Sequence, residues 1–362
     1  MKILIATGGT GGHLYPALAL ASYIKLEDNE CEFLFVGTKN RLEAQVVPSE
    51  GYRYIGMDIK GLSGSLLNKM NAVRIFVTSL AKSKKVIREF NPDIVIGFGG
   101  YVSSSIVLAA TQLNIPTLIH EQNSIIGLAN KILIKHVDTI VVCYEKAYQE
   151  LPKEKTYLLG NPRASEVLSA KINTDIYKKY KLDRSKKTVL IVMGSLGSSS
   201  INKVVINALP YFATKKYQII FVTGKEEYEN VTKQVQKDYA NIRIIPYVDD
   251  MPSVQHQIDV IISRAGASTI AEITSLGVAS ILIPSPYVAS NHQEFNAREL
   301  VEKEAALMIL EKDLSKTKLV NEIDNLLENP TNINVLKENA KKLGKPNANK
   351  DIYDLIVKII RK

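Results

Sequence analysis

The segment Thr188–Ser200, with the sequence TVLIVMGSLGSSS, repeats the plan of the chain's own beginning, Lys2–His13, with the sequence KILIATGGTGGH. Each segment reads as a buried strand of consecutive apolar residues, a glycine-rich loop and the start of a helix. A strand, a loop and a helix in this order open a βαβ unit. The repeat therefore predicts two α/β domains.

Further apolar runs continue the pattern in both halves of the chain. They lie at 32–36, 93–97, 116–119 and 139–142, and then at 218–222, 242–245, 259–262 and 279–283. Helical patterns separate these runs, as they do in parallel sheets. We predict two Rossmann-like, doubly wound parallel-sheet domains that face each other across a cleft, because ligands of such sheets bind beyond the carboxyl ends of the strands.

A break in the pattern after Gly160-Asn161-Pro162 marks the domain boundary. We predict an N-terminal domain of residues 1–161 and a C-terminal domain of residues 162–345. A last helix, within 346–362, carries one apolar face that needs a partner surface. We expect this helix to pack back on the first domain.

Composition and charge set wide limits. The chain has 362 residues and a formal net charge of +9, which could serve phosphates, an anionic membrane surface or nucleic acid. Two distant cysteines do not indicate a disulfide framework or a zinc site. No segment reaches the roughly 20 apolar residues of a membrane span. We expect a protein that is soluble or bound to a membrane face from the cytoplasm.

The stretch Ser263–Asn296 reads as a ligand pocket: SRAGASTIAEITSLGVASILIPSPYVASNHQEFN. A strand ends before Arg264, and small residues, Ala267 and Ser268 among them, open a helix whose free N–H groups and dipole can receive a diphosphate. Glu272, one turn beyond Ser268, can accept two hydrogen bonds from a ribose diol.

The end of this stretch, His292-Gln293 in particular, offers neutral hydrogen-bonding groups suited to sugar hydroxyls. The alternative is a helix cap followed by a solvated loop. The order of phosphate, diol and sugar groups favours a nucleotide-sugar pocket.

The first glycine loop, GGTGGH at Gly8–His13, is a candidate anion cradle. It lacks the lysine of a P-loop, and Leu14 stands where a dinucleotide fingerprint needs its last glycine. His13 could act as a general base, because imidazole titrates near neutral pH. The alternative is a histidine that caps the helix or bonds a phosphate, and the base role is slightly favoured.

Two more loops follow strands of the first half. Gly99, Gly100 and Tyr101 could bind another phosphate, or the glycines could allow close helix packing. Glu121 could be a base or a hydroxyl ligand and Asn123 a sugar ligand, although a structural hydrogen-bond network is the competing account.

In the second half, Ser195, between Gly194 and Gly197, suits a nucleotide phosphate.

Another stretch indicates where in the cell the protein acts. It combines apolar residues at helical spacing with surrounding basic residues, and such a surface could rest on anionic lipid. A core-facing helix with a solvated basic face is the alternative. The apolar set is Leu66, Leu67, Met70, Val73, Phe76, Val77 and Leu80, and the basic set is Lys69, Arg74, Lys82, Lys84, Lys85 and Arg88.

Taken together, the ordered motifs resemble the MurG family of peptidoglycan glycosyltransferases along essentially the whole chain. The motifs are GGTGGH at Gly8–His13, GGYVS at Gly99–Ser103, HEQN at His120–Asn123, GNP at Gly160–Pro162, RAGASTIAE at Arg264–Glu272 and HQEFNA at His292–Ala297.

The resemblance implies a GT-B fold and an inverting transfer. N-acetylglucosamine would pass from UDP-N-acetylglucosamine, held mainly by the second domain, to the C4 hydroxyl of the muramoyl-pentapeptide of lipid I, held mainly by the first, giving lipid II. It also implies peripheral contact with the anionic cytoplasmic face of the cell membrane, no cofactor, no tightly bound metal and no nucleic-acid partner.

Carried over by position, the resemblance makes His13 the favoured base and leaves Glu121 as the other catalytic candidate. It places Asn123 and Gln293 at the donor sugar, Glu272 at the ribose and the backbone of Val248 at the uracil. The full substrate-binding set is Thr10, Gly11, Gly12, Gly99, Gly100, Tyr101, Asn123, Arg163, Ser195, Val248, Arg264, Ala267, Ser268, Thr269, Glu272, His292 and Gln293.

Two competing functions remain. A sugar-nucleotide epimerase of the same fold would need no lipid acceptor, and the basic amphipathic stretch and the HEQN motif argue against it. A non-catalytic sugar-nucleotide binding subunit is the other, and retention of both lobes, His13 and Glu121 argues against that.

Overall fold

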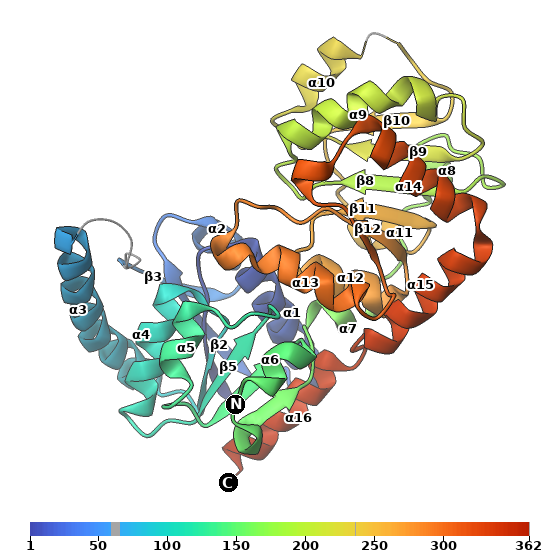
Figure 1. Cartoon of the computed structure of the whole chain (residues 1–362). Helices are drawn as coiled ribbons and strands as arrows, with labels where there is room; N and C mark the ends of the chain where they lie inside the picture. The colour runs from blue at the N-terminus through green and yellow to red at the C-terminus, as the bar shows by residue number, and fades with distance from the viewer. Residues whose placement is uncertain (59–65, 236, 362) are drawn as a thin grey trace. The chain divides into compact units, whose positions relative to one another are not determined.

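Residues 1–58, 66–235 and 237–361 are described in a computed structural model, and in residues 66–77 only the helical backbone is described. The chain divides into two units between Glu166 and Val167, and residues 347–362 belong to the first unit (Figure 1). Each unit is an α/β domain built on one parallel sheet.

The first unit contains a seven-stranded sheet with the order β3-β2-β1-β4-β5-β6-β7. Its strands are β1 (Lys2–Ala6), β2 (Glu32–Thr38), β3 (Arg53–Met57), β4 (Ile94–Gly97), β5 (Thr117–Glu121), β6 (Thr139–Val142) and β7 (Thr156–Leu158). Its helices are α1 (Gly11–Glu27), α2 (Leu42–Ser49), α3 (Leu66–Phe90), α4 (Gly100–Thr111), α5 (Leu128–Leu133), α6 (Glu145–Gln149), η1 (Lys153–Lys155) and α16 (Ala348–Ile360), and α7 (Arg163–Ser169) spans the division.

Strand β1 shows why the apolar runs form central strands. It pairs in parallel with β2 on one side and β4 on the other. Leu4 and Ala6 pack into the core on one face of the sheet, and Ile3 and Ile5 pack into the core on the other. Both faces are covered by helices, so consecutive residues must be apolar.

The C-terminal helix α16 packs against α1 in the first unit. Ile352, Leu355 and Ile356 are buried in the same core cluster as Ile3 and Ile5. The apolar face that the sequence indicated is thus covered by the first sheet's own layer of helices.

The second unit contains a six-stranded parallel sheet with the order β10-β9-β8-β11-β12-β13. Its strands are β8 (Thr188–Val192), β9 (Gln218–Val222), β10 (Ile242–Ile245), β11 (Val260–Ser263), β12 (Ala279–Leu282) and β13 (Leu307–Met308). Its helices are α8 (Ile176–Lys179), α9 (Ser199–Phe212), α10 (Tyr228–Gln234), α11 (Met251–Gln255), α12 (Ala267–Leu276), η2 (Ala289–Asn291), α13 (His292–Val301), η3 (Glu311–Asp313), α14 (Lys316–Glu328) and α15 (Pro330–Leu343).

Both sheets reverse their strand order at a defined point, which lies between β1 and β4 in the first unit and between β8 and β11 in the second. Ligands of doubly wound sheets bind at such points, beyond the carboxyl ends of the strands. The predicted pair of doubly wound parallel sheets is confirmed. The glycine loops after β1 and β8 stand at the two reversals.

Helix α3 carries the stretch that we predicted to be amphipathic and cationic. The apolar residues Leu66 to Val77 of that prediction, with Lys69 and Arg74, lie outside the side chains that the structure describes. Further along, Leu80 packs on the core of the first unit, whereas Lys82, Lys85 and Arg88 are exposed. Among the helices of the described residues, none combines the length and the apolar composition needed to cross a bilayer.

Candidate functional sites at the two sheet reversals

His13 lies in the first turn of α1, at the reversal of the first sheet, and is half-buried. Its Nδ1 atom is 2.9 Å from the carbonyl oxygen of Gly8. A carbonyl only accepts, so Nδ1 carries the proton in the neutral ring. The lone pair therefore resides on Nε2, which is the arrangement a general base needs.

The second glycine loop packs against the first. A Cβ at Gly100 would lie 2.5 Å from the Gly8 carbonyl oxygen, and one at Gly99 would lie 3.0 Å from His13 Nε2. Both glycines have positive φ angles, 108° at Gly99 and 83° at Gly100, which side chains other than glycine rarely adopt. Close packing therefore accounts for these glycines, and it places the ring of His13 beside Gly99, the N-cap residue of α4.

The opening of α1 can still receive an anion. Thr10 is its N-cap residue but makes no side-chain capping bond, and the first turn holds no acidic residue. Thr10 and Gly12 are exposed, and Gly11 is half-buried. The N–H groups and the positive end of the helix dipole at this turn favour negative charge.

A buried carboxylate that the sequence did not reveal supports this loop. Glu43 of α2 is fully buried, and its Oε1 accepts hydrogen bonds from Thr38 Oγ1 at 2.6 Å, Thr38 N at 3.0 Å and Gly9 N at 3.4 Å. Its Oε2 has no hydrogen-bond partner within the described part of the chain. Glu43 follows β2, the strand next to β1, so the shared carboxyl edge of the sheet was the signal that could have identified it.

Glu121, at the end of β5, uses both carboxylate oxygens for hydrogen bonds to the segment that follows it. Its Oε1 accepts from the backbone N and the side-chain Nδ2 of Asn123, at 3.1 and 3.3 Å. Its Oε2 accepts from Gly127 N at 2.8 Å and Asn130 Nδ2 at 2.9 Å. The carboxylate is 3% exposed and both oxygens are engaged, so the structural network that we weighed as an alternative is present. This arrangement argues for Glu121 as a residue that orders the loop and positions Asn123.

His120 is a core residue of the same segment. Its Nε2 donates to the Gly160 carbonyl at 2.9 Å, its Nδ1 accepts from Gln122 Nε2 at 3.1 Å, and its ring stacks on Phe98. Burial lowers the pKa of His120 to about 4, and the bond to Gly160 only partly opposes this. His120 is therefore neutral at physiological pH.

Arg163 lies at the end of the first unit, directly after the GNP motif. Its backbone N–H bonds Asn161 Oδ1 at 3.0 Å, and its guanidinium forms an ion pair with Glu166. The side chain is half-buried in this pair. For Arg163 to contact a bound sugar nucleotide, its ion pair with Glu166 would have to open, or the guanidinium would have to donate hydrogen bonds to both partners at once.

In the second unit, Ser195 lies in the exposed loop between β8 and α9. Gly194 and Gly197 both have positive φ angles, 85° and 76°. A Cβ at Gly197 would lie only 2.0 Å from the carbonyl oxygen of Thr223, so this loop rests directly on the end of β9. Ser195 is thereby presented at the carboxyl edge of the sheet.

The neighbouring helix α12 contains several of the predicted ligands. Gly266 is its N-cap residue, and Ala267, Ser268 and Thr269 form its first turn. Ser268 Oγ is buried and has no hydrogen-bond partner within the described residues. An orphaned hydroxyl at a helix N-terminus suits a ligand with acceptor oxygens.

Glu272 lies further along α12 and is 6% exposed. Its Oε2 accepts a hydrogen bond from Gln255 Nε2 at 3.0 Å, a partner from α11 that the sequence did not indicate. Val248 is buried in the loop that precedes α11, so its side chain faces the core. That placement is compatible with recognition through the backbone.

The sugar-recognition residues follow an unusual turn. Ser290 and Asn291 have positive φ angles of 53° and 51°, which are uncommon for residues other than glycine and cluster at functional sites. His292 Nδ1 donates to the Ala289 carbonyl at 2.8 Å. Gln293 Oε1 accepts from Ser285 N at 2.9 Å, which orients its amide Nε2 as the donor for a ligand.

Arg264, in contrast, is engaged within the protein. Its Nη1 lies 2.7 Å from Glu311 Oε2, and the two side chains are 13% and 11% exposed. Its Nη2 donates to Ser198 Oγ at 3.0 Å. The resemblance included Arg264 among the substrate-binding residues, and in the structure its guanidinium faces the carboxylate of Glu311.

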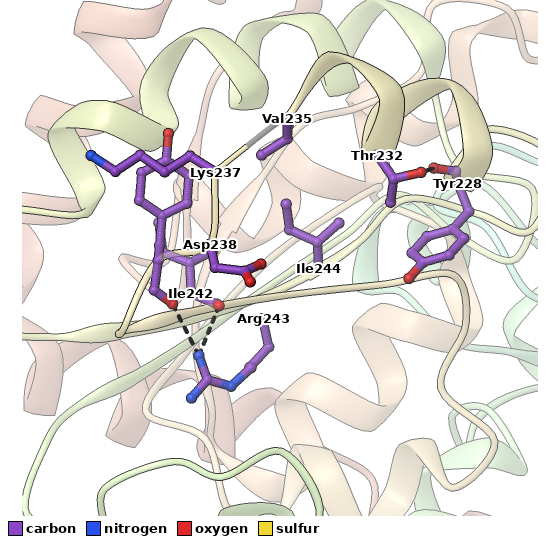
Figure 2. Close-up of a pocket in the computed structure, with 9 residues that line it drawn as sticks. Tyr228, Thr232, Val235, Lys237, Asp238, Ile242, Arg243 and Ile244 are labelled. Carbon is purple, nitrogen blue, oxygen red and sulfur yellow. Dashed lines mark hydrogen bonds between the residues drawn. The ribbon is translucent and has the colours of Figure 1, made fainter.

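A separate pocket of about 360 Å³ lies between α10 and β10 (Figure 2). Tyr228, Val235 and Ile244 contribute to its walls, and none of the predicted site residues does. Arg243 Nη1 donates to the carbonyl oxygens of Tyr239 and Ile242, at 3.2 and 2.9 Å, and both of these residues also line the pocket. The pocket lies along the edge strand, remote in sheet order from the reversal at β8 and β11.

Comparison with known proteins decides the family. Residues 3–142 match the glycosyltransferase family 28 N-terminal domain, and residues 188–356 match the glycosyltransferase family 28 C-terminal domain. A curated relative from Pediococcus pentosaceus is 44% identical over 359 residues, which cover 98% of this chain and 99% of the relative. It is a UDP-N-acetylglucosamine–N-acetylmuramyl-(pentapeptide) pyrophosphoryl-undecaprenol N-acetylglucosamine transferase.

The chain belongs to the MurG family of glycosyltransferases. The crystal structure of Acinetobacter baumannii MurG matches it with a TM-score of 0.78 at 28% identity, covering 99% of each chain, and so confirms the GT-B fold expected of the MurG family. A UDP-N-acetylglucosamine 2-epimerase from Neisseria meningitidis has a TM-score of 0.66 at 16% identity and covers 99% of this chain and 100% of its own. That lower likeness shows a shared fold alone.

Proposed function

We propose that the chain is an inverting glycosyltransferase that moves N-acetylglucosamine from UDP-N-acetylglucosamine to the C4 hydroxyl of the muramoyl sugar of lipid I. The product is lipid II, the precursor for peptidoglycan synthesis. The observation that carries this proposal is the full-length likeness to the Pediococcus pentosaceus transferase, whose name states the same donor sugar and the same lipid-linked acceptor.

The donor belongs, in this proposal, to the reversal of the second sheet. The N-terminal turn of α12, with Ser268 and Thr269, receives the diphosphate together with Ser195. Glu272 accepts the ribose hydroxyls, and the backbone of Val248 bonds the uracil. His292 and Gln293 bond the sugar, and the bond from Ser285 N to Gln293 Oε1 supports this because it fixes the amide's orientation.

The acceptor belongs to the reversal of the first sheet, where His13 is the proposed base. The C4 oxygen of the muramoyl sugar attacks the anomeric carbon and gives its proton to His13 Nε2. The bond from the anomeric carbon to the diphosphate oxygen breaks, and UDP leaves with the electron pair. One displacement inverts the anomeric centre, and helix N-termini stabilise the charge that develops on UDP.

The acceptor is a lipid, so the first unit must work at a membrane surface. We propose that the basic residues of α3 hold the protein at the cytoplasmic face, as a peripheral protein. Lys82, Lys85 and Arg88 support this because they are exposed on one helix. Glu89 of the same helix pairs with Lys85 at 3.7 Å on the surface, where such pairs are weak.

A transfer assay tests the proposal. Protein is incubated with UDP-N-acetylglucosamine and a lipid I analogue, and the products are separated by mass and by retention. We expect an N-acetylglucosaminylated acceptor and UDP in equal amounts. An epimerised sugar nucleotide without the acceptor would replace the proposal with the epimerase function, and bound but unchanged donor would replace it with a binding subunit.

A further inference from the structure

Four side chains of the second unit form a closed ring of polar contacts. Arg264 Nη2 donates to Ser198 Oγ at 3.0 Å, and Ser198 Oγ lies 3.1 Å from Ser200 Oγ. Ser200 Oγ donates to Glu311 Oε1 at 2.6 Å. Glu311 Oε2 lies 2.7 Å from Arg264 Nη1 and closes the ring.

The protons of this ring run in one direction. Arg264 only donates and the Glu311 carboxylate only accepts. Ser200 Oγ donates its one hydrogen bond to Glu311, so its oxygen must accept from the Ser198 hydroxyl, which in turn accepts from Arg264. A ring of contacts with one fixed hydrogen-bond direction favours one geometry over its alternatives.

The ring joins segments that are far apart in the sequence. Ser198 ends the loop that carries Ser195, Arg264 directly follows β11, and Glu311 follows β13. Arg264 Nη1 also donates to the carbonyl of Ile283, at the end of β12, at 3.2 Å. Together with the ring, this contact links the segments that follow β8, β11, β12 and β13, at the edge of the sheet where the donor is proposed to bind.

We propose that Glu311 is a positioning residue for the donor. It holds Arg264 so that the Ser195 loop and the turn at Gly266 keep the spacing that a nucleoside diphosphate requires. In this arrangement backbone N–H groups bind the diphosphate, and the guanidinium of Arg264 connects the loops through its contacts with Ser198 and Glu311. This inference rests on the proposed function, since it concerns the UDP part of the same donor.

A different role for Glu311 predicts the opposite change in UDP affinity. If Glu311 only screened a phosphate-binding Arg264, removal of the carboxylate would free the guanidinium and tighten UDP binding. If Glu311 holds the loops, removal loosens them and weakens UDP binding. The pair is nearly buried, so loss of one partner leaves a charge without its counterpart and disturbs the ring strongly.

The experiment compares Glu311→Gln, Ser198→Ala and the double variant with the wild type. UDP affinity is measured by calorimetry, and the KM for UDP-N-acetylglucosamine, the KM for the lipid I analogue and kcat are measured in the transfer assay. We expect each single change to raise the UDP Kd and the donor KM about tenfold. The acceptor KM should stay unchanged, and the double variant should be little worse than either single one, because both changes open the same ring.

Asp324→Asn is the matched control. Asp324, in α14, pairs with Lys215 and accepts a hydrogen bond from Tyr217 OH at 3.0 Å. Lys215 and Tyr217 come just before β9, so this contact lies at the amino edge of the sheet. The substitution removes a partly buried ion pair of the same unit without touching the donor loops. We expect it to lower the unfolding temperature and to leave the donor KM unchanged.

Three results would overturn the inference. These are tighter UDP binding by Glu311→Gln, a donor KM equal to that of the wild type, and fully additive effects in the double variant. If the wild type itself binds no UDP, the proposed function fails and this inference fails with it. Wild-type binding with an unaffected Glu311 variant removes only the inference.

Discussion

The Nδ1 atom of His13 lies 2.9 Å from the carbonyl oxygen of Gly8, so the ring donates a hydrogen bond to its own loop. The neutral ring is fixed in the tautomer whose Nε2 is basic. His120, which lies in the same unit, shows the opposite tautomer, because its Nε2 donates to Gly160. Of these two histidines, only His13 is both partly exposed and oriented to take a proton.

Replacement of His13 should therefore stop turnover while sparing the donor. We expect His13→Ala to lower kcat by about 10²–10⁴-fold, the range that a general base contributes. UDP affinity, measured by calorimetry, should stay at the wild-type value, since the residues proposed to bind the UDP part of the donor, Ser195, Val248, Ser268, Thr269 and Glu272, belong to the second unit.

The matched variant is His13→Asn. Its amide nitrogen can still donate to the Gly8 carbonyl, so the loop should keep its shape, but the amide has no basic atom. We expect wild-type unfolding behaviour and the same loss of kcat as in His13→Ala. Wild-type turnover in His13→Asn would remove the assignment of the base.

Glu121 should behave as a structural carboxylate. In Glu121→Gln one of the two oxygens becomes a donor that faces Gly127 N and Asn130 Nδ2, or Asn123, all of which donate. We expect the first unit to lose about 1–3 kcal/mol of stability in chemical unfolding, the usual cost of a buried mismatch. A variant of full stability with kcat reduced as far as in His13→Ala would instead identify Glu121 as the base.

Much of the fold could be predicted, because central parallel strands are buried on both faces and show as apolar runs. The three strands that the sequence did not reveal, β3, β7 and β13, are edge strands of their sheets. Most residues of these strands, RYIGM, TYL and LM, are exposed or only partly buried, whereas Met57 and Thr156 are buried. One uncovered side removes the need for a continuous apolar run, so the pattern fades where the sheet ends.

The site was predictable in part for a similar reason. Glycine loops, and polar residues on the helix that follows a strand and its loop, such as His13 and Glu272, are visible because the strand fixes where the loop and the helix begin. Glu43, Gln255 and Glu311 act on those residues from other segments. Their contacts depend on how helices and loops pack, which one sequence does not reveal.

Membrane contact should depend on the basic face of α3. We expect reversal of Lys82, Lys84 and Lys85 to glutamate to reduce co-sedimentation with anionic vesicles, because each basic residue near such a surface contributes about 1 kcal/mol. The control reverses three exposed lysines of the second unit, Lys225, Lys233 and Lys237. Equal losses in both variants, or none in the first, would contradict the proposed contact.

Acid should destabilise the first unit through His120. Its pKa in the folded protein is lowered to about 4, mainly by burial, whereas the ordinary value is 6.5. Between these values the unfolded chain binds a proton that the folded chain does not, so stability falls as the pH falls. The loss should begin near the ordinary value, end near pH 4, and reach about 3 kcal/mol.

Unfolding followed against pH checks this expectation. In His120→Gln the titrating group is gone, while the amide can still donate to the Gly160 carbonyl. The variant should lose that part of the acid dependence and remain less stable than the wild type at neutral pH. An acid dependence identical to that of the wild type would show that another group is responsible.

The contact between the two glycine loops of the first unit should limit what Gly100 can become. Gly100 and Gly51 have nearly the same backbone angle, with φ of 83° and 81°. A Cβ at Gly100 would lie 2.5 Å from the Gly8 carbonyl oxygen, whereas a Cβ at Gly51 would meet no described atom within 4 Å. Alanine at either position carries the strain of a positive φ, about 1–3 kcal/mol.

Only Gly100→Ala should also displace the Gly8 carbonyl, and with it the acceptor of the His13 hydrogen bond. We expect Gly51→Ala to lose stability while it keeps kcat, and Gly100→Ala to lose both. Calorimetric unfolding and the transfer assay measure the two effects separately. Equal kcat in the two variants would mean that the Gly8 carbonyl does not orient His13 for the reaction.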